Sequence, residues 1–387
     1  MKIISADWLV ICDENNSIIQ NGAVVFTDKI QEVDTLNNIE KKYPNIEIEK
    51  LAKNSVLMPG LINSHIHLEF SGNTTTLKYG NFYSWLNSVI KHREDLISKA
   101  NTKLILSKLS KMKRTGTTTI GAISSYSFDL DACVKSPLNK VFFCEVIGTK
   151  GDMIDTLFAD FKDRLNIAKK YKSANFIPAI AIHSPYSVHP FLVRETLKLA
   201  REENLPVTSH FLESREEFEW LHKDEGAFVE FFKNFLGQEQ SVTKPMEFLN
   251  LFSNIKNLSF THCVEASSAD FDKIKLLGAS VNHCVTSNRF LNNTKLDLEK
   301  LKDIPFTIGT DGLSSNNSLS MFDELRNVLM THYDKNVLEF SNVLLKAATI
   351  NGSRALGLNK GSLAEGLDAD IIALTLPDEI EEKEDLA

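Results

Sequence analysis

Two histidines, His65 and His67, stand two residues apart at the end of an apolar run, in the stretch PGLINSHIHLEF (59–70). Side chains at positions i and i+2 of a strand project from the same face, so both rings are predicted to point the same way. That geometry suits two ligands of one metal ion. It also arises by chance, so the rest of the chain must decide between the two interpretations.

Other groups that can bind a metal ion also follow short apolar runs. We predict that each run is a strand and that these groups meet at one end of the same sheet. A single histidine at a strand end is more often a hydrogen-bonded core residue, but a shared location for several is hard to obtain by accident. The seven groups are His65, His67, His183, His210, His262, His283 and Asp311.

The remaining four histidines have other predicted places. His92, His222 and His332 lie in helical or loop patterns and are predicted to be at the surface. His189 directly precedes Pro190 and is predicted to shape the turn into a helix.

Two carboxylates complete the candidate site. Glu213 follows His210 by three residues in SHFLES, within reach of whatever His210 binds, and Asp311 lies in IGTDG before a glycine that permits a sharp turn. Three neutral imidazoles and one carboxylate suit Zn²⁺ or Fe²⁺, and an open coordination position binds water and lowers its pKa toward ~7. A second carboxylate can then transfer protons. The expected chemistry is metal-assisted hydrolysis.

Eight short β-rich runs alternate with segments whose apolar residues recur at helical spacing. This order predicts a (β/α)8 barrel, which presents catalytic groups at the C-terminal ends of its strands, with a doubly wound sheet as the alternative. The predicted strands are 56–68, 115–124, 139–148, 176–184, 205–211, 258–263, 279–284 and 305–312.

Both chain ends contain short β-like pieces separated by turns. We predict that residues 1–55 and 359–387 fold together into a small accessory β-sandwich beside a barrel of residues 56–358. The acidic ending PDEIEEKEDLA is predicted to be frayed.

Composition limits the class of partner. The net charge of −8 and the pI near 5.8 provide no basic surface for nucleic acid, so a small-molecule substrate is expected. No apolar run is long enough to span a membrane, and the N-terminal residues do not resemble a signal peptide, so the protein is predicted to be cytoplasmic and independent of membranes. The five cysteines are widely spaced and are predicted to be buried free thiols.

The motifs PGLINSHIHLEF, SHFLES, THC, NHCVTSN and GTDG resemble, in order, those of the amidohydrolase superfamily, and KGSLAEGLDADIIAL resembles the strand pair that returns to its accessory sandwich. The resemblance covers nearly the whole chain. It implies that Glu213 is the proton shuttle, that His262 orients the attacking water and that His183 contacts the substrate. It also implies four metal ligands, His65, His67, His210 and Asp311, with Asp311 also passing a proton to the leaving group.

The resemblance implies one metal ion per subunit, because the fourth strand lacks the lysine that bridges two metals in other members. Zn²⁺ and Fe²⁺ both fit, and assembly into a homodimer is left open.

Within the superfamily the chain is most similar to the aminohydrolases. The Glu69 after H-x-H-L and the FSGN that follows resemble the 6-aminodeoxyfutalosine deaminases of the futalosine route to menaquinone. The implied reaction replaces the adenine C6 amino group by oxygen and releases ammonia.

Residues that contact the substrate are predicted around the first and seventh strands. Glu69, Phe82 and Trp85 are candidates for ribose hydroxyls and an aromatic tail, and Arg289 is a candidate for a carboxylate, since guanidinium pairs well with it. Ser287 lies in a turn that resembles the family's, although Val285-Thr286 replaces the usual proline there. Ordinary packing or a surface ion pair is the alternative for these residues.

Three other functions stay open at this point. The same metal chemistry serves deaminases of S-adenosylhomocysteine, methylthioadenosine, adenosine or guanine, and it serves triazine chlorohydrolases, because loops select the substrate. A non-catalytic barrel that binds a partner is the remote alternative. It is disfavoured because the ligand set and Glu213 are complete.

Overall fold

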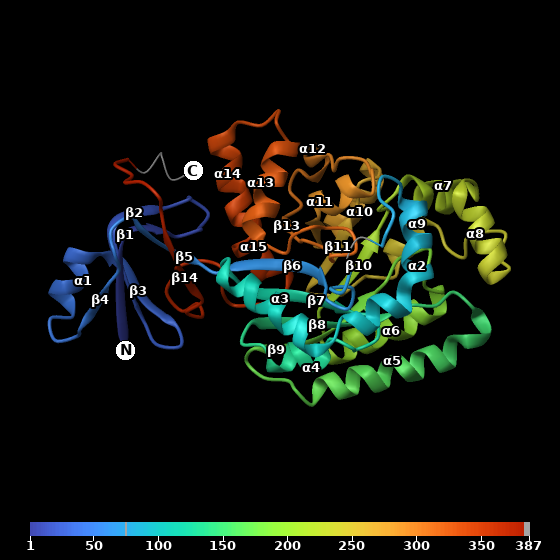
Figure 1. The fold of residues 1–387 in the computed structure, drawn as a ribbon, viewed down its shortest axis with the longest axis horizontal. Helices are drawn as coiled ribbons and strands as arrows, with labels where there is room; N and C mark the ends of the chain where they lie inside the picture. The colour runs from blue at the N-terminus through green and yellow to red at the C-terminus, as the bar shows by residue number, and fades with distance from the viewer. Residues whose placement is uncertain (74–75, 383–387) are drawn as a thin grey trace.

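The computed structural model describes residues 1–73 and 76–382. Eight parallel strands follow one another around a barrel in chain order, and helices pack outside them (Figure 1). The barrel strands are β6 (Leu61–His67), β7 (Thr117–Ser124), β8 (Asn139–Val146), β9 (Phe176–Ile182), β10 (Val207–Phe211), β11 (Leu258–His262), β12 (Ser280–His283) and β13 (Phe306–Ile308).

The last strand closes on the first through hydrogen bonds. The backbone N–H of Asp311 donates to the carbonyl of His65 (3.1 Å), and the Ser64 hydroxyl donates to the carbonyl of Ile308 (2.8 Å). Gly309 permits this approach, because a Cβ there would lie 2.8 Å from the His65 Cβ. The predicted (β/α)8 barrel is therefore confirmed, and the doubly wound alternative is wrong.

The main apolar core lies between the strands and the surrounding helices. The longer helices put one apolar face against the strands, as expected for surface helices of a barrel. The helices are α2 (Phe82–Lys99), α3 (Thr102–Arg114), α4 (Leu130–Lys135), α5 (Ile154–Lys169), α6 (Pro190–Glu203), α7 (Arg215–Lys223), α8 (Ala227–Leu236), α9 (Pro245–Asn250), α10 (Ser268–Leu276), α11 (Val285–Phe290), α12 (Leu298–Leu301), α13 (Met321–Thr331), α14 (Val337–Ala347) and α15 (Ile350–Ala355).

Two helix starts illustrate how local sequence sets the boundaries. The His189 side chain caps α6, whose first residue is Pro190, which confirms the predicted role of His189 at this turn. The Ser214 hydroxyl accepts the N–H of Glu217 and starts α7 directly after the Glu213 motif. Glu213 therefore lies between the end of β10 and a capped helix.

The chain ends form a separate six-stranded mixed sheet to one side of the barrel (Figure 1). Its elements are β1 (Lys2–Val10), β2 (Ile18–Phe26), β3 (Ile30–Thr35), β4 (Ile48–Lys50), β5 (Ser55–Pro59) and β14 (Ile371–Thr375), with α1 (Leu36–Lys42) beside them. The predicted accessory unit is present. Its division from the barrel at residues 55 and 359 stays a prediction, and residues 383–387 of the predicted frayed end lie outside the described residues.

The first predicted strand requires a correction. Residues 56–68 were expected to form one strand, but they divide at Gly60 into β5, which pairs with β1 and β14, and β6, which opens the barrel. Both pieces are buried, so the apolar pattern does not change where the chain passes from one sheet to the other.

The five cysteines are free and buried, as predicted. Within residues 1–73 and 76–382, no helix combines the length and the apolarity needed to cross a bilayer.

Candidate active site

Four side chains from three strand ends converge at the C-terminal end of the barrel. His65 and His67 come from β6, His210 from β10, and Asp311 follows β13. The Nε2 atoms of His65 and His67 lie 3.9 and 3.6 Å from the Asp311 Oδ1, and the Nε2 atoms of His67 and His210 are 3.3 Å apart. Ligand atoms of His65, His67 and Asp311 all lie within 4.8 Å of one another, and the short contact between His67 and His210 brings His210 next to that group.

The protonation pattern of these groups fits a cation. The Nδ1–H of His210 donates to the carbonyl of His183 (2.8 Å), so its Nε2 carries a lone pair. Burial lowers the pKa of His67 to about 3, so its ring is neutral as well. The Nε2 of His65 is buried and has no hydrogen-bond partner in the described part of the chain. Neutral imidazoles that face a carboxylate form a site for a divalent metal ion.

Asp311 is held rigidly toward the histidines. It has a left-handed backbone (φ +58°), and the hydroxyls of Ser287 and Ser315 donate to its Oδ2 at 2.7 and 2.8 Å. Burial alone would raise the pKa of Asp311, but the neighbouring imidazoles of His67, His262 and His65 hold it well below its usual range. Asp311 is therefore an anionic group with a fixed orientation, as its predicted role as a metal ligand requires.

Glu213 and His262 stand beside the ligand set. The Glu213 Oε1 lies 3.5 Å from the His262 Nε2. The Nδ1–H of His262 donates to the Asn288 Oδ1 (2.8 Å), which leaves the Nε2 lone pair facing the site. Burial, and then the charge of Asp311, raises the pKa of Glu213 well above its ordinary value. A raised pKa makes the Glu213 carboxylate a better proton acceptor than an ordinary one, which suits a role in proton transfer.

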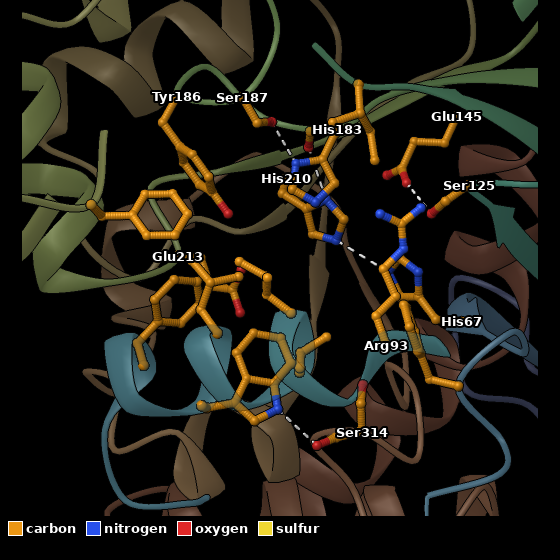
Figure 2. A pocket seen from close by; sticks show the side chains of 18 of the residues that line it. His67, Arg93, Ser125, Glu145, His183, Tyr186, Ser187, His210, Glu213 and Ser314 are labelled. Carbon is orange, nitrogen blue, oxygen red and sulfur yellow. Dashed lines mark hydrogen bonds between the residues drawn. The ribbon is translucent and has the colours of Figure 1, made fainter. Parts of the chain in front are cut away.

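A cavity of about 340 Å³ opens above these groups (Figure 2). Its floor contains His67, His210, Glu213, His262 and Asp311. One wall is a stripe on α2 at helical three- and four-residue spacing: Phe82, Trp85, Leu86, Val89, Ile90 and Arg93. Phe231, Phe232 and Leu236 of α8 contribute further apolar surface. A small ligand can therefore meet the polar floor while most of its surface is shielded from water.

The amidohydrolase family model matches residues 56–386 of the chain. The chain belongs to the amidohydrolase family. An aminodeoxyfutalosine deaminase from Nitratiruptor sp. is 46% identical over 370 residues, which cover 96% of this chain and 91% of that protein. An adenosine deaminase from Helicobacter pylori is 34% identical over 379 residues, with 96% and 91% covered.

Solved structures agree with this family assignment. The structure of Helicobacter pylori aminofutalosine deaminase in complex with methylthio-coformycin has a TM-score of 0.94 and 31% sequence identity to this chain. The superposition covers 100% of this amidohydrolase and 95% of the other chain.

Three of the predicted substrate contacts line the cavity of this amidohydrolase. Phe82 and Trp85 belong to the α2 stripe, and the Trp85 indole N–H donates to the carbonyl of Ser314 (2.8 Å). The Nδ1 of His183 lies 2.5 Å from the Ser187 hydroxyl, so the opposite edge of the ring is left for a ligand. Their contacts with a substrate stay predictions.

Glu69 is not part of the cavity lining, contrary to its predicted contact with ribose. Its carboxylate is buried and accepts the backbone N–H groups of Ser125 (2.8 Å), Tyr126 (3.0 Å) and Phe128 (2.9 Å). These bonds fix the loop after β7, because a buried carboxylate with several N–H donors is fully occupied. Glu69 therefore acts on the cavity through Ser125 and Tyr126.

Arg289 and Ser287 are not cavity-lining residues either. Arg289 is exposed on α11, outside the cavity. Ser287 is buried and donates to Asp311, so it orients a predicted metal ligand, whereas a substrate contact was predicted for it. The absence of the family's proline does not prevent this turn from forming α11.

His283 and His332 also require correction. His283 faces away from the cavity, and its Nε2 lies 3.1 Å from the Nε2 of His332, which follows α13. Both rings are buried, so His332 is not a surface residue. These two residues form a structural pair between β12 and α13. His222 is exposed and His92 partly so, in keeping with their predicted places.

Several cavity residues were not found from the sequence: Arg93, Ser125, Tyr126, Glu145 and Tyr186. The continuous helical spacing from Phe82 would have led to Arg93. Glu145 interrupts the apolar run VFFCEVIG within a predicted strand. Burying a carboxylate is costly, so a single one in such a run indicates a specific binding or structural role.

Proposed function

We propose that this amidohydrolase is a metal-dependent deaminase that hydrolyses the C6 amino group of 6-aminodeoxyfutalosine to give the 6-oxo product and ammonia. Glu213 and His262, next to the four predicted ligands at the floor of the cavity, support the chemical part of the proposal. The 46% identity to an aminodeoxyfutalosine deaminase supports the choice of substrate. The reaction would then be a step of the menaquinone route.

The residues present suit one Zn²⁺ or Fe²⁺ per chain, held by His65, His67, His210 and Asp311. A bound ion of this kind lowers the pKa of a coordinated water toward ~7 and so supplies the nucleophile at neutral pH. Strand β9 contains no lysine, which agrees with a single metal.

The proton transfers fall to side chains of this chain. Glu213 as a carboxylate accepts a proton from the attacking water and, as the acid, donates it to the purine N1. The Nε2 lone pair of His262 accepts a hydrogen bond from the same water and so aims it at C6. Asp311 passes the second proton to the amino group, because NH₂⁻ cannot leave unprotonated. Water and the aminopurine are thereby converted into the 6-oxopurine and ammonia.

The α2 stripe favours a nucleoside with an aromatic tail that carries a carboxylate. Phe82, Trp85 and their neighbours offer apolar surface, and Arg93 adds a cation at the exposed end of the stripe. The Arg93 guanidinium lies 4.2 Å from the centroid of the Tyr126 ring and forms no ion pair with the carboxylates that the structure describes. We infer that Arg93, in place of Arg289, pairs with the tail carboxylate.

Adenosine is the second candidate substrate, because the Helicobacter pylori relative at 34% identity is named an adenosine deaminase. Methylthioadenosine, S-adenosylhomocysteine, guanine and triazines use the same chemistry and stay alternatives. A cytoplasmic location and assembly into a homodimer stay predictions.

A substrate panel tests the proposal. The purified metal-loaded protein is incubated with 6-aminodeoxyfutalosine, adenosine, methylthioadenosine, S-adenosylhomocysteine, guanine and atrazine, and ammonia release and purine absorbance are followed. We expect the highest kcat/KM for 6-aminodeoxyfutalosine. Equal or better turnover of guanine or atrazine would overturn the proposal. Chelation should abolish turnover, and added Zn²⁺ or Fe²⁺ should restore it.

A matched variant separates metal loss from loss of the proton shuttle. Glu213→Gln keeps the volume of the side chain and removes its proton transfer, so kcat should fall by about 10²- to 10⁴-fold. Metal content per chain should stay at the wild-type value.

A further inference from the structure

Glu145 is a buried carboxylate with one free oxygen that lines the cavity. It is 1% exposed and lies one residue before the end of β8. The Ser125 hydroxyl donates to its Oε2 at 2.5 Å, whereas its Oε1 has no hydrogen-bond partner among residues 1–73 and 76–382. In Figure 2, Glu145 and Ser125 lie across His210 from Glu213.

The surroundings of Glu145 form a built site. Glu69 binds the backbone N–H of Ser125 (2.8 Å) and so fixes the hydroxyl that holds Glu145. Arg164 donates to the Glu145 carbonyl (2.9 Å), which fixes the end of β8. Ligand atoms of Glu145, His183 and His210 all lie within 4.8 Å of one another, so the carboxylate is next to the reaction floor.

A buried acceptor without a donor loses the hydrogen bonds it would make to water, and the loss is greater when it is charged, so a ligand that supplies a donor is favoured here. On an adenine nucleoside the ring nitrogens N1, N3 and N7 are acceptors. The donors are the C6 amino group and the sugar hydroxyls. In the proposed reaction the amino group must meet Asp311, which protonates it, so the sugar hydroxyls are the donors left for Glu145.

We propose that Glu145, held by Ser125, binds a hydroxyl of the substrate's ribose and makes this amidohydrolase selective for ribonucleosides. The proposal rests on the proposed function, since it takes the substrate to be a nucleoside. It assigns to Glu145 the contact that the sequence suggested for Glu69, and it leaves Glu69 as the positioning residue of the same subsite. A second cation bound by Glu145, His183 and His210 is the competing explanation.

Deoxynucleosides test the proposal. kcat/KM is measured for adenosine, 2′-deoxyadenosine and 3′-deoxyadenosine, and the same three nucleosides are measured as competitive inhibitors of 6-aminodeoxyfutalosine turnover. We expect the wild type to discriminate against at least one deoxynucleoside by about 100-fold, because a site built to bind a hydroxyl rejects the analogue that lacks it. In Glu145→Met, which removes both oxygens at similar volume, the ratio should fall to about threefold or less.

Three controls keep the result interpretable. Glu145→Ala repeats the measurement if methionine blocks the cavity. Asp270→Asn removes a different buried carboxylate, which caps α10 away from the site, and should leave the ratio unchanged. Metal analysis should find the same content in the wild type and in Glu145→Met.

The outcomes are distinct. An unchanged ribose-to-deoxyribose ratio in the Glu145 variants, or no discrimination by the wild type, overturns this inference while the deaminase proposal stands. A loss of one metal ion per chain in Glu145→Met also overturns it and assigns the carboxylate to a cation. Failure of the wild type to process any adenine nucleoside would overturn the proposed function itself.

Discussion

Strands β11 and β12 are neighbours in the barrel and end in similar residues, Thr261-His262-Cys263 and Asn282-His283-Cys284. Thr261 and Asn282 both point into the barrel, where the Asn282 amide donates to the Thr261 hydroxyl (2.9 Å). Strand alternation then directs the next residue outward. His283 obeys this rule and packs against His332, whereas His262 turns into the active site.

The backbone of His262 accounts for the difference. His262 has φ +71°, a left-handed conformation that a residue with a Cβ rarely adopts, and this rotation brings its ring toward Glu213. Asp311 and Leu212, which precedes Glu213, also have positive φ (+58° and +46°). Location at a strand end therefore does not by itself place a side chain in the cavity. The local backbone conformation decides which side chain reaches it. Such strain is typical of functional sites.

The largest effect is expected when His262 and His283 are replaced separately and the activities of the two variants are compared. His262→Gln should lower kcat by about 10²- to 10⁴-fold, because the water loses its orienting acceptor. His283→Gln should keep kcat within about threefold, because its ring does not reach the cavity. Steady-state kinetics on the best substrate of the panel check both values, with metal content as the control. Equal losses of kcat in the two variants would show that the backbone φ does not separate an active-site histidine from a structural one.

A smaller effect is expected for the residue that orients His262. Asn288→Ala removes the acceptor for the Nδ1–H, so kcat should fall by about 10- to 100-fold with little change in KM. Asn288→Asp retains an acceptor and should recover most of the loss. If aspartate is as impaired as alanine, Asn288 contributes packing and does not orient the ring.

The buried pair of His283 and His332 should affect the free energy of unfolding and its dependence on pH. Burial lowers the pKa of His283 to about 3 and that of His332 to about 4. Below the ordinary pKa of about 6.5 the unfolded chain takes up protons that the folded pair excludes, so the free energy of unfolding decreases as pH falls from about 6.5 toward 4. At pH 5 the contribution of His283 is on the order of 2 kcal/mol.

Urea unfolding at pH 7.5 and pH 5 measures this dependence. In His283→Gln, the decrease in the free energy of unfolding between pH 7.5 and pH 5 should be smaller than in the wild type by about the contribution of His283. In His222→Gln, at an exposed position, the decrease should equal that of the wild type. An identical pH profile in wild type and His283→Gln would mean that the pair does not control acid stability.

Much of the barrel was predictable because strands and helices alternate with distinct periodicities. Each of β7 to β13 lies within the range predicted for it. The chemistry-bearing residues His65, His67, His210 and Asp311 also converge as expected, since parallel strands share one C-terminal edge. The passage from β5 to β6 was missed because both strands are buried and read as one apolar run.

The substrate side of the cavity was less predictable. Glu69 follows the metal motif directly, yet its partners are backbone groups at residues 125–128, which the chain brings back only through β7. Arg289 was predicted to bind a carboxylate because it follows the seventh strand and carries a guanidinium group, but α11 carries it to the surface. Arg93 and Glu145 line the cavity although they lie far in sequence from the four predicted metal ligands.

By itself, the sequence determined the barrel, the family and the convergence of His65, His67, His210 and Asp311, the four predicted metal ligands, beside Glu213, the predicted proton shuttle. These features depend on periodicity and on residue type at strand ends, which act locally. The tertiary structure alone decided which of two similar histidines enters the cavity and that Glu145 and Arg93, in place of Glu69 and Arg289, line it. Those outcomes depend on left-handed backbone turns and on contacts between residues distant in sequence, which no local pattern encodes.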